Sequence, residues 1–157
     1  MEITQLNLLL GDDDKDDCLF FNEAISELPY SIQLTTVYNG DQVIQWLTSG
    51  KNTLPHILFL DLNLPRRNGY ECLSQVKQIE VLKSLPVIII STSFIQKMAD
   101  QLYNNGAHFY IRKPTEFSKL KTLIHQAIIL SLKNNFIQPP LKYYLLTGDL
   151  NAYSYTD

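Results

Sequence analysis

The sequence is poor in features that mark several classes of protein. It has two cysteines, Cys18 and Cys72, without neighbouring metal ligands. They are expected to be small core or surface residues in a reducing compartment rather than a disulfide. No apolar run approaches the roughly 18 residues that span a bilayer, and no basic and apolar regions of a signal peptide follow Met1 and Glu2. These absences predict a cytoplasmic protein that does not enter a membrane.

The sequence also lacks a surplus of basic residues. Its 13 Lys and Arg residues face 16 Asp and Glu residues, which gives a formal net charge of −3. Without a basic patch to neutralise phosphates, general nucleic-acid binding is not expected. The 157 residues suffice for one domain with a full-sized core, but not for two.

Apolar runs typical of strands alternate with segments of helical periodicity five times along the chain. Strands are expected at residues 6–10, 32–37, 57–60, 86–90 and 107–112, and helices at about 16–28, 41–48, 68–81, 96–103 and 115–132. Since the strands lack polar alternation, the sheet should be buried on both faces. The order predicts an α/β fold: a flavodoxin-like, doubly wound (βα)5 sandwich with a parallel sheet of strand order 2-1-3-4-5.

Polar residues follow four of the expected strands. Asp12 and Asp13 follow the first strand, Asp61 the third, Ser91 the fourth and Lys113 the fifth. In the predicted topology these strand ends share one edge of the sheet, where such folds bind ligands. Two carboxylates about 4 Å apart repel by roughly 4 kcal/mol at an effective dielectric near 20. A cluster of three therefore indicates a hard divalent cation, for which Mg²⁺ is the natural choice.

Each of these residues also has an ordinary structural interpretation. Asp61 alone could open a turn, Lys113 could be a surface lysine, and Ser91 could be a plain strand-end hydroxyl. The acidic run at residues 12–17 is also typical of a helix N-terminus, which accounts for Asp16 and Asp17. Taken together, however, a carboxylate, a metal site, a lysine and a hydroxyl indicate an aspartyl-phosphate intermediate.

Four motifs carry a resemblance to a known family. LLLGDDD, LFLDLNLPRRNGYE, PVIIISTS and GAHFYIRKP occur in this order, one near each of four strand ends. The set resembles the receiver domain of two-component response regulators and covers about residues 6–132. We therefore expect a receiver domain at residues 1–134 and a C-terminal tail at residues 135–157.

The resemblance implies a role for the residues around the metal. Asp61 would accept a phosphoryl group from a phosphohistidine on a sensor histidine kinase or phosphotransfer protein. Asp12, Asp13 and Asp61 would hold Mg²⁺, with the backbone carbonyl of Asn63 as a further ligand. The protein would be a phosphoacceptor, catalysing at most its own phosphorylation and dephosphorylation, rather than a conventional enzyme.

The resemblance also implies how phosphorylation is sensed. Lys113 would pair with the phosphoryl oxygens, and Ser91 would follow them inward. Tyr110 matches the switch aromatic, whose half-buried ring moves inward when the region of Ser91 shifts. The bond between Lys113 and Pro114 resembles one that is cis in receivers.

Two departures from the family pattern leave every functional group in place. Gly11 stands where a larger apolar residue is usual, which we expect to loosen that strand end. Ser91 replaces the commoner threonine and keeps its hydroxyl.

Two other kinds of protein share part of this pattern. A phosphatase of the haloacid dehalogenase type needs a second acid two residues after its nucleophile, and here that residue is Asn63. A protein-binding module that uses the receiver fold without phosphorylation remains the alternative.

The expected output is a protein contact. Only roughly 20 residues follow the last helix, too few for a DNA-binding or catalytic effector domain. We expect a single-domain response regulator that binds a downstream protein or passes phosphate along a relay, with its reporting surface near residues 96–132. The tail is too apolar for a purely disordered end and should pack back on the domain or across a homodimer, through Phe136, Ile137, Tyr143, Tyr144 and Leu145.

Overall fold

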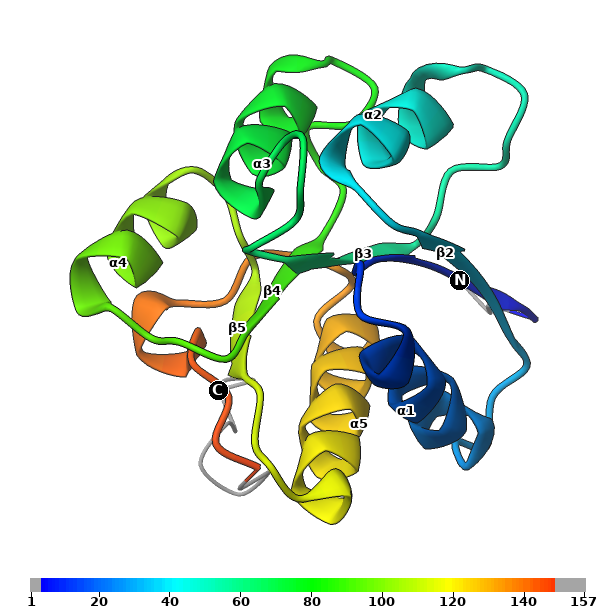
Figure 1. The fold of residues 1–157 in the computed structure, drawn as a ribbon, viewed down its shortest axis with the longest axis vertical. Helices are drawn as coiled ribbons and strands as arrows, with labels where there is room; N and C mark the ends of the chain where they lie inside the picture. Colours follow the sequence, from blue (N-terminus) through cyan, green and yellow to red (C-terminus); the bar gives the residue numbers. More distant parts are fainter. Residues whose placement is uncertain (1–3, 149–157) are drawn as a thin grey trace.

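Five strands form one parallel sheet between two layers of helices (Figure 1). The computed structural model describes residues 4–148, so Met1, Glu2 and the predicted tail beyond residue 148 lie outside it. The sheet has the order β2-β1-β3-β4-β5, as predicted. Its strands are β1 (Leu6–Gly11), β2 (Ile32–Val37), β3 (Ile57–Asp61), β4 (Val87–Ser91) and β5 (Phe109–Arg112).

The helices follow the strands in strict alternation. They are α1 (Lys15–Ser26), α2 (Gly40–Thr48), α3 (Gly69–Gln78), α4 (Gln96–Asn104) and α5 (Phe117–Lys133), followed by the short 3₁₀ helix η1 (Leu141–Tyr143). α1 and α5 cover one face of the sheet, and α2, α3 and α4 cover the other (Figure 1). Between residues 4 and 148, none of these helices is both long and apolar enough to cross a bilayer.

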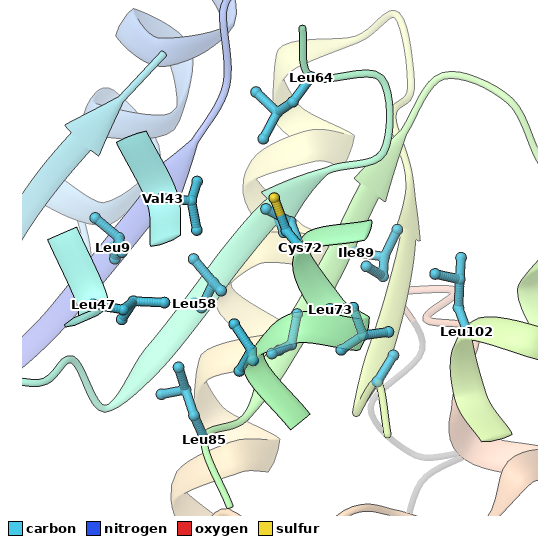
Figure 2. Close-up of a cluster of buried hydrophobic side chains, with 14 of the residues drawn as sticks. Leu9, Val43, Leu47, Leu58, Leu64, Cys72, Leu73, Leu85, Ile89 and Leu102 are labelled. Carbon is cyan, nitrogen blue, oxygen red and sulfur yellow. The ribbon is translucent and has the colours of Figure 1, made fainter. Parts of the chain in front are cut away.

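The sheet separates two hydrophobic cores. Every residue of β3 and β4 is buried, because both strands have helices on each side. Figure 2 shows part of the core under α2, α3 and α4, where Leu58 and Ile89 of the sheet lie against Leu73 of α3. Cys72 belongs to this core as a small apolar residue. The continuous apolar runs in the sequence therefore predicted the central strands correctly.

Helix α3 ends earlier than the periodicity predicts. It stops at Gln78 instead of Val81, and Ile79 has an extended backbone. The connection to β4 turns back so that Leu82 and Leu85 are buried, and Lys77 Nζ donates to the carbonyl oxygens of Lys83 (3.1 Å) and Leu85 (2.6 Å) in it. Val81, which the periodicity placed in the helix, lies in this connection and is exposed.

Gly11 ends β1 without loosening it, contrary to our expectation. It is paired with Val37 of β2 and with Leu60 of β3. A Cβ at this position would lie 2.9 Å from Val43 Cγ2 and 3.2 Å from Leu64 Cδ1. A larger residue would require the side chains of Val43 and Leu64 to shift. The glycine therefore allows α2 to pack closely on the strand end.

Candidate functional site

The carboxyl ends of four strands lie along one edge of the sheet. Asp12 and Asp13 follow β1, Asp61 ends β3, Ser91 ends β4, and Lys113 follows β5. These strands are consecutive neighbours in the parallel sheet, so their ends meet at the same edge. The structure thus gathers on one edge all the strand-end residues that the sequence analysis selected.

Lys113 lies at the centre of the site. Its Nζ donates to Asp12 Oδ2 at 3.1 Å and to Asp61 Oδ2 at 3.1 Å. A third carboxylate, that of Asp17 on α1, accepts from the same Nζ at 2.8 Å. Asp12 and Asp61 are only 3% and 7% exposed, so these ion pairs are largely shielded from solvent.

Asp12, Asp13 and Asp61 form a carboxylate cluster that could hold a metal ion. One oxygen of each lies within 4.8 Å of the others, and Asp13 is exposed while the other two are buried. The other oxygens of the buried pair are fixed by the main chain: Asp12 Oδ1 accepts from Asp14 N–H (3.0 Å) and Asp61 Oδ1 from Asn63 N–H (2.9 Å). A set of oxygen ligands with one side open to solvent fits a hard divalent cation that keeps some of its waters.

Burial and charge shift the protonation of two groups in the site. Burial raises the pKa of Asp12 to about 6, and the charge of Asp61 adds to this, against the lowering effects of the Asp14 amide and Lys113. Burial would lower the pKa of Lys113, but the hydrogen bond that Lys113 donates to Asp17 and the charges of Asp61 and Asp12 outweigh it and raise this pKa above its usual value. Lys113 therefore stays cationic among an excess of carboxyl groups.

Asp17 is a site residue that sequence reasoning missed, because it was assigned to the helix N-terminus. The N-cap of α1 is Asp14, whose side chain accepts from the amides of Asp16 and Asp17. This cap leaves the Asp17 carboxylate free to reach Lys113 across the sheet edge. A signal was present: α1 starts four residues after the end of β1, so its first turn borders the same edge as Asp12.

Ser91 and Tyr110 are joined through the loop after β4. The Ser91 hydroxyl lies 3.2 Å from that of Ser93 and accepts from Ser93 N–H at 3.3 Å. Tyr110 OH donates to the Ser93 carbonyl oxygen at 2.6 Å. The Tyr110 ring packs edge-on against Phe94 (5.2 Å between centroids) and is 1% exposed. Tyr110 is therefore fully buried rather than half-buried as expected.

The cis bond expected before Pro114 is absent. The described residues contain no cis peptide bond, so the bond between Lys113 and Pro114 is trans. Asn63 contributes its N–H to Asp61, while a role for its carbonyl as a metal ligand stays a prediction.

The sequence is similar to those of known proteins. The family model of the response regulator receiver domain matches residues 8–125. The probable methanogenesis regulatory protein FilR2 of Methanothrix harundinacea is 29% identical over 122 residues, which cover 76% of this chain and 79% of FilR2. Response regulator Rcp1 of Synechocystis is 26% identical over 121 residues, covering 74% and 82%. Two other curated relatives are longer proteins, and the matched regions cover only 48% and 24% of their lengths.

Solved structures agree with the sequence matches. The phosphorylated cyanobacterial phytochrome response regulator RcpA superposes with a TM-score of 0.77 at 26% identity, over 83% of this chain and 96% of RcpA. The Mn²⁺-bound form of Rcp1 gives a TM-score of 0.74 at 24% identity, over 86% and 99%. With the family model covering most of the chain and the acidic edge in place, this protein belongs to the response regulator receiver domain family, a family of phosphoacceptor signalling modules.

Proposed function

We propose that this protein is a single-domain response regulator that accepts a phosphoryl group on Asp61 from a histidine kinase or phosphotransfer protein. The observation that carries the proposal is the setting of Asp61. Asp61 is 7% exposed at the end of β3. One of its carboxylate oxygens accepts a hydrogen bond from Asn63 N–H, and the other accepts one from Lys113 Nζ. It also lies within the carboxylate cluster of Asp12 and Asp13.

The transfer is a displacement at phosphorus. An oxygen of the Asp61 carboxylate attacks the phosphohistidine, the new O–P bond forms, and the P–N bond breaks with its electron pair returning to the imidazole. Lys113 already touches the Asp61 carboxylate, so its ammonium is placed to pair with the oxygens of the incoming phosphoryl group. Before the transfer, Asp12 and Asp17 share that ammonium and would compete with the phosphoryl oxygens for it.

Asp12, Asp13 and Asp61 are proposed to hold Mg²⁺, with the carbonyl of Asn63 as a further ligand. When bound, the ion would neutralise charge on the phosphoryl oxygens and on the crowded carboxylates. Rcp1, 26% identical to this chain, has been crystallised in a Mn²⁺-bound form, which supports an oxygen-ligated divalent site here.

Phosphorylation would be read out through Ser91 and Tyr110. When the Ser91 hydroxyl turns to the phosphoryl group, the loop after β4 moves with it. Because the Tyr110 hydroxyl donates to the Ser93 carbonyl oxygen in that loop, the Tyr110 ring is held inward. The result is a changed surface for a partner protein.

The proposal predicts Mg²⁺-dependent labelling of one residue. Wild type incubated with acetyl phosphate and Mg²⁺ should gain one acid-stable, base-labile phosphate, detected by intact mass. The Asp61→Asn variant should gain none, because the amide is no nucleophile, and Asp13→Asn should lose most labelling at low Mg²⁺. Labelling of Asp61→Asn at the wild-type level would overturn the proposal and favour a binding module that acts without phosphorylation.

A further inference from the structure

Residues 136–148, here the C-terminal segment, lie along the free edge of the sheet (Figure 1, orange to red). Tyr110 N–H donates to the Tyr144 carbonyl oxygen at 2.9 Å, and Leu146 N–H donates to the Tyr110 carbonyl oxygen at 3.0 Å. β5 is an edge strand, whose outward backbone groups would otherwise face solvent or a foreign strand. The segment thus satisfies the two main-chain groups of Tyr110 that point away from the sheet.

Side chains of the segment enter both hydrophobic cores. Tyr144 is 3% exposed, with its ring 5.1 Å from the ring of Tyr103 on α4 and 6.1 Å from that of Tyr110. Leu146 is buried in the core beneath α5. The alternative that the tail packs back on its own domain is therefore the one found in the described residues, although Ile137 is exposed.

Polar contacts fix the segment at both of its ends. Gln138 Nε2 donates to the carbonyl oxygens of Tyr103 (2.9 Å) and Ala107 (2.8 Å). Ten residues later, Gly148 N–H donates to Gln126 Oε1 of α5 at 2.9 Å. The segment is thereby attached to α4, to β5 and to α5, the elements expected to form the reporting surface.

One residue connects this segment to the acidic site. Tyr110 holds the segment through its backbone and its ring, and it holds Ser93 through its hydroxyl. Ser93 in turn contacts the Ser91 hydroxyl at the end of β4. A continuous series of contacts therefore runs from the carboxyl edge of the sheet through Ser91, Ser93 and Tyr110 to Tyr144.

We infer that the C-terminal segment is the chain's own ligand for the surface of α4, β5 and α5, and that its attachment and the phosphorylation of Asp61 stabilise each other through Tyr110. The inference rests on the proposed function, in which the phosphoryl group favours the inward ring. Tyr144 packs on that inward ring, so the segment and the phosphoryl group favour the same position of Tyr110. Such coupling is reciprocal and typically changes binding about 5- to 150-fold.

Hydrogen exchange of the 157-residue chain tests the inference. Three amides report attachment of the segment, because each takes part in a hydrogen bond between the segment and the rest of the fold: Tyr110 N–H donates to Tyr144, Leu146 N–H to Tyr110, and Gly148 N–H to Gln126. With Mg²⁺ and beryllofluoride, a phosphoryl mimic, they should exchange at least about fivefold more slowly than without it. In Tyr110→Phe the ring and both backbone bonds remain, but the bond to Ser93 is lost, so the mimic should leave the exchange rates unchanged.

The reverse effect is measured by ligand titration. Tyr144→Ala removes the packing on Tyr110 and should raise the beryllofluoride concentration for half-saturation at least about fivefold. Ile137→Ala, an exposed position of the same segment, should leave it unchanged. Binding of the mimic is followed by ¹⁹F NMR in every sample. If wild type binds no beryllofluoride and gains no phosphate, the proposed function fails; if it binds the mimic while the amides exchange at the same rate, only the inference fails.

Discussion

At the scale of single residues, Lys113 is the most constrained side chain of the site. Its one ammonium group contacts Asp12, Asp17 and Asp61, which come from a strand end, a helix and another strand end. A phosphoryl group on Asp61 must compete with these carboxylates for the same donor. Asp17 is the one among them outside the carboxylate cluster, so it can be changed without removing a proposed metal ligand.

We predict that Asp17→Asn speeds labelling by acetyl phosphate roughly fivefold. Removing a carboxylate beside Lys113 weakens the repulsion of the anionic donor by about 1 kcal/mol and frees the ammonium for the phosphoryl oxygens. Asp16→Asn is the matched control, since this exposed neighbour loses the same charge but does not contact Lys113. Equal labelling rates for the two variants, followed by intact mass, would contradict a specific role for Asp17.

At the scale of elements, the contact between α4 and the C-terminal segment contains two tyrosine hydroxyls in opposite situations. Tyr103 OH donates to the Pro139 carbonyl oxygen at 2.7 Å. The buried Tyr144 OH, by contrast, has no hydrogen-bond partner among the described residues. A buried polar group without a partner costs about 1–3 kcal/mol.

The same chemical change at these two positions should have opposite effects. Tyr144→Phe should raise the free energy of unfolding by about 1 kcal/mol, because it removes an unsatisfied hydroxyl, and Tyr103→Phe should lower it by about 1 kcal/mol, because it breaks a bond to the segment. Urea denaturation at pH 7 measures both. A Tyr144→Phe protein destabilised as much as Tyr103→Phe would show that the hydroxyl has a partner.

At the scale of the whole molecule, two buried titratable groups lie at opposite ends of the parallel strands. Asp12 lies at the carboxyl ends, and His108 lies at the amino end of β5. Burial lowers the pKa of His108, which directly precedes β5, to about 4, and the charge of Lys77 adds to this against hydrogen bonds to Phe136 and Gly106. The folded protein therefore binds a proton at His108 less readily than the unfolded chain does. The contribution of neutral His108 to the free energy of unfolding is complete above pH 6.5 and is lost as pH falls toward 4. Asp12, with its raised pKa, acts in the opposite sense: its unfavourable burial is relieved as pH falls below about 6.

We predict that His108→Gln gains about 3 kcal/mol of stability relative to wild type when pH falls from 7 to 4. Glutamine can still donate toward the Phe136 carbonyl oxygen, which His108 Nε2 contacts at 3.0 Å, but it does not titrate. Comparing the two proteins at each pH by urea denaturation cancels the contribution of Asp12, which both contain. A difference that stays constant with pH would contradict the burial of a neutral imidazole.

The fold and most of the acidic edge could be predicted from sequence because short apolar runs and strand-end residues are local signals. The end of α3 could not, since the apolar residues Ile79 and Leu82 after it are also used to cover the core, from a connection that is no longer helical. The contact of Asp17 with Lys113 joins residues 96 positions apart, and the pairing of Tyr110 with the C-terminal segment is likewise a tertiary contact. Such contacts leave no periodic pattern in the sequence.

The position of Lys113 in the chain has a consequence for synthesis. Its ion pairs with Asp12 and Asp61 join residues 101 and 52 positions apart. A nascent chain completed only through β4 already carries the acidic residues of the site but not the lysine that neutralises them. The edge can therefore reach its final charge balance only after β5 and Lys113 have been added, and until then the carboxylates of the growing chain have no lysine with which to pair.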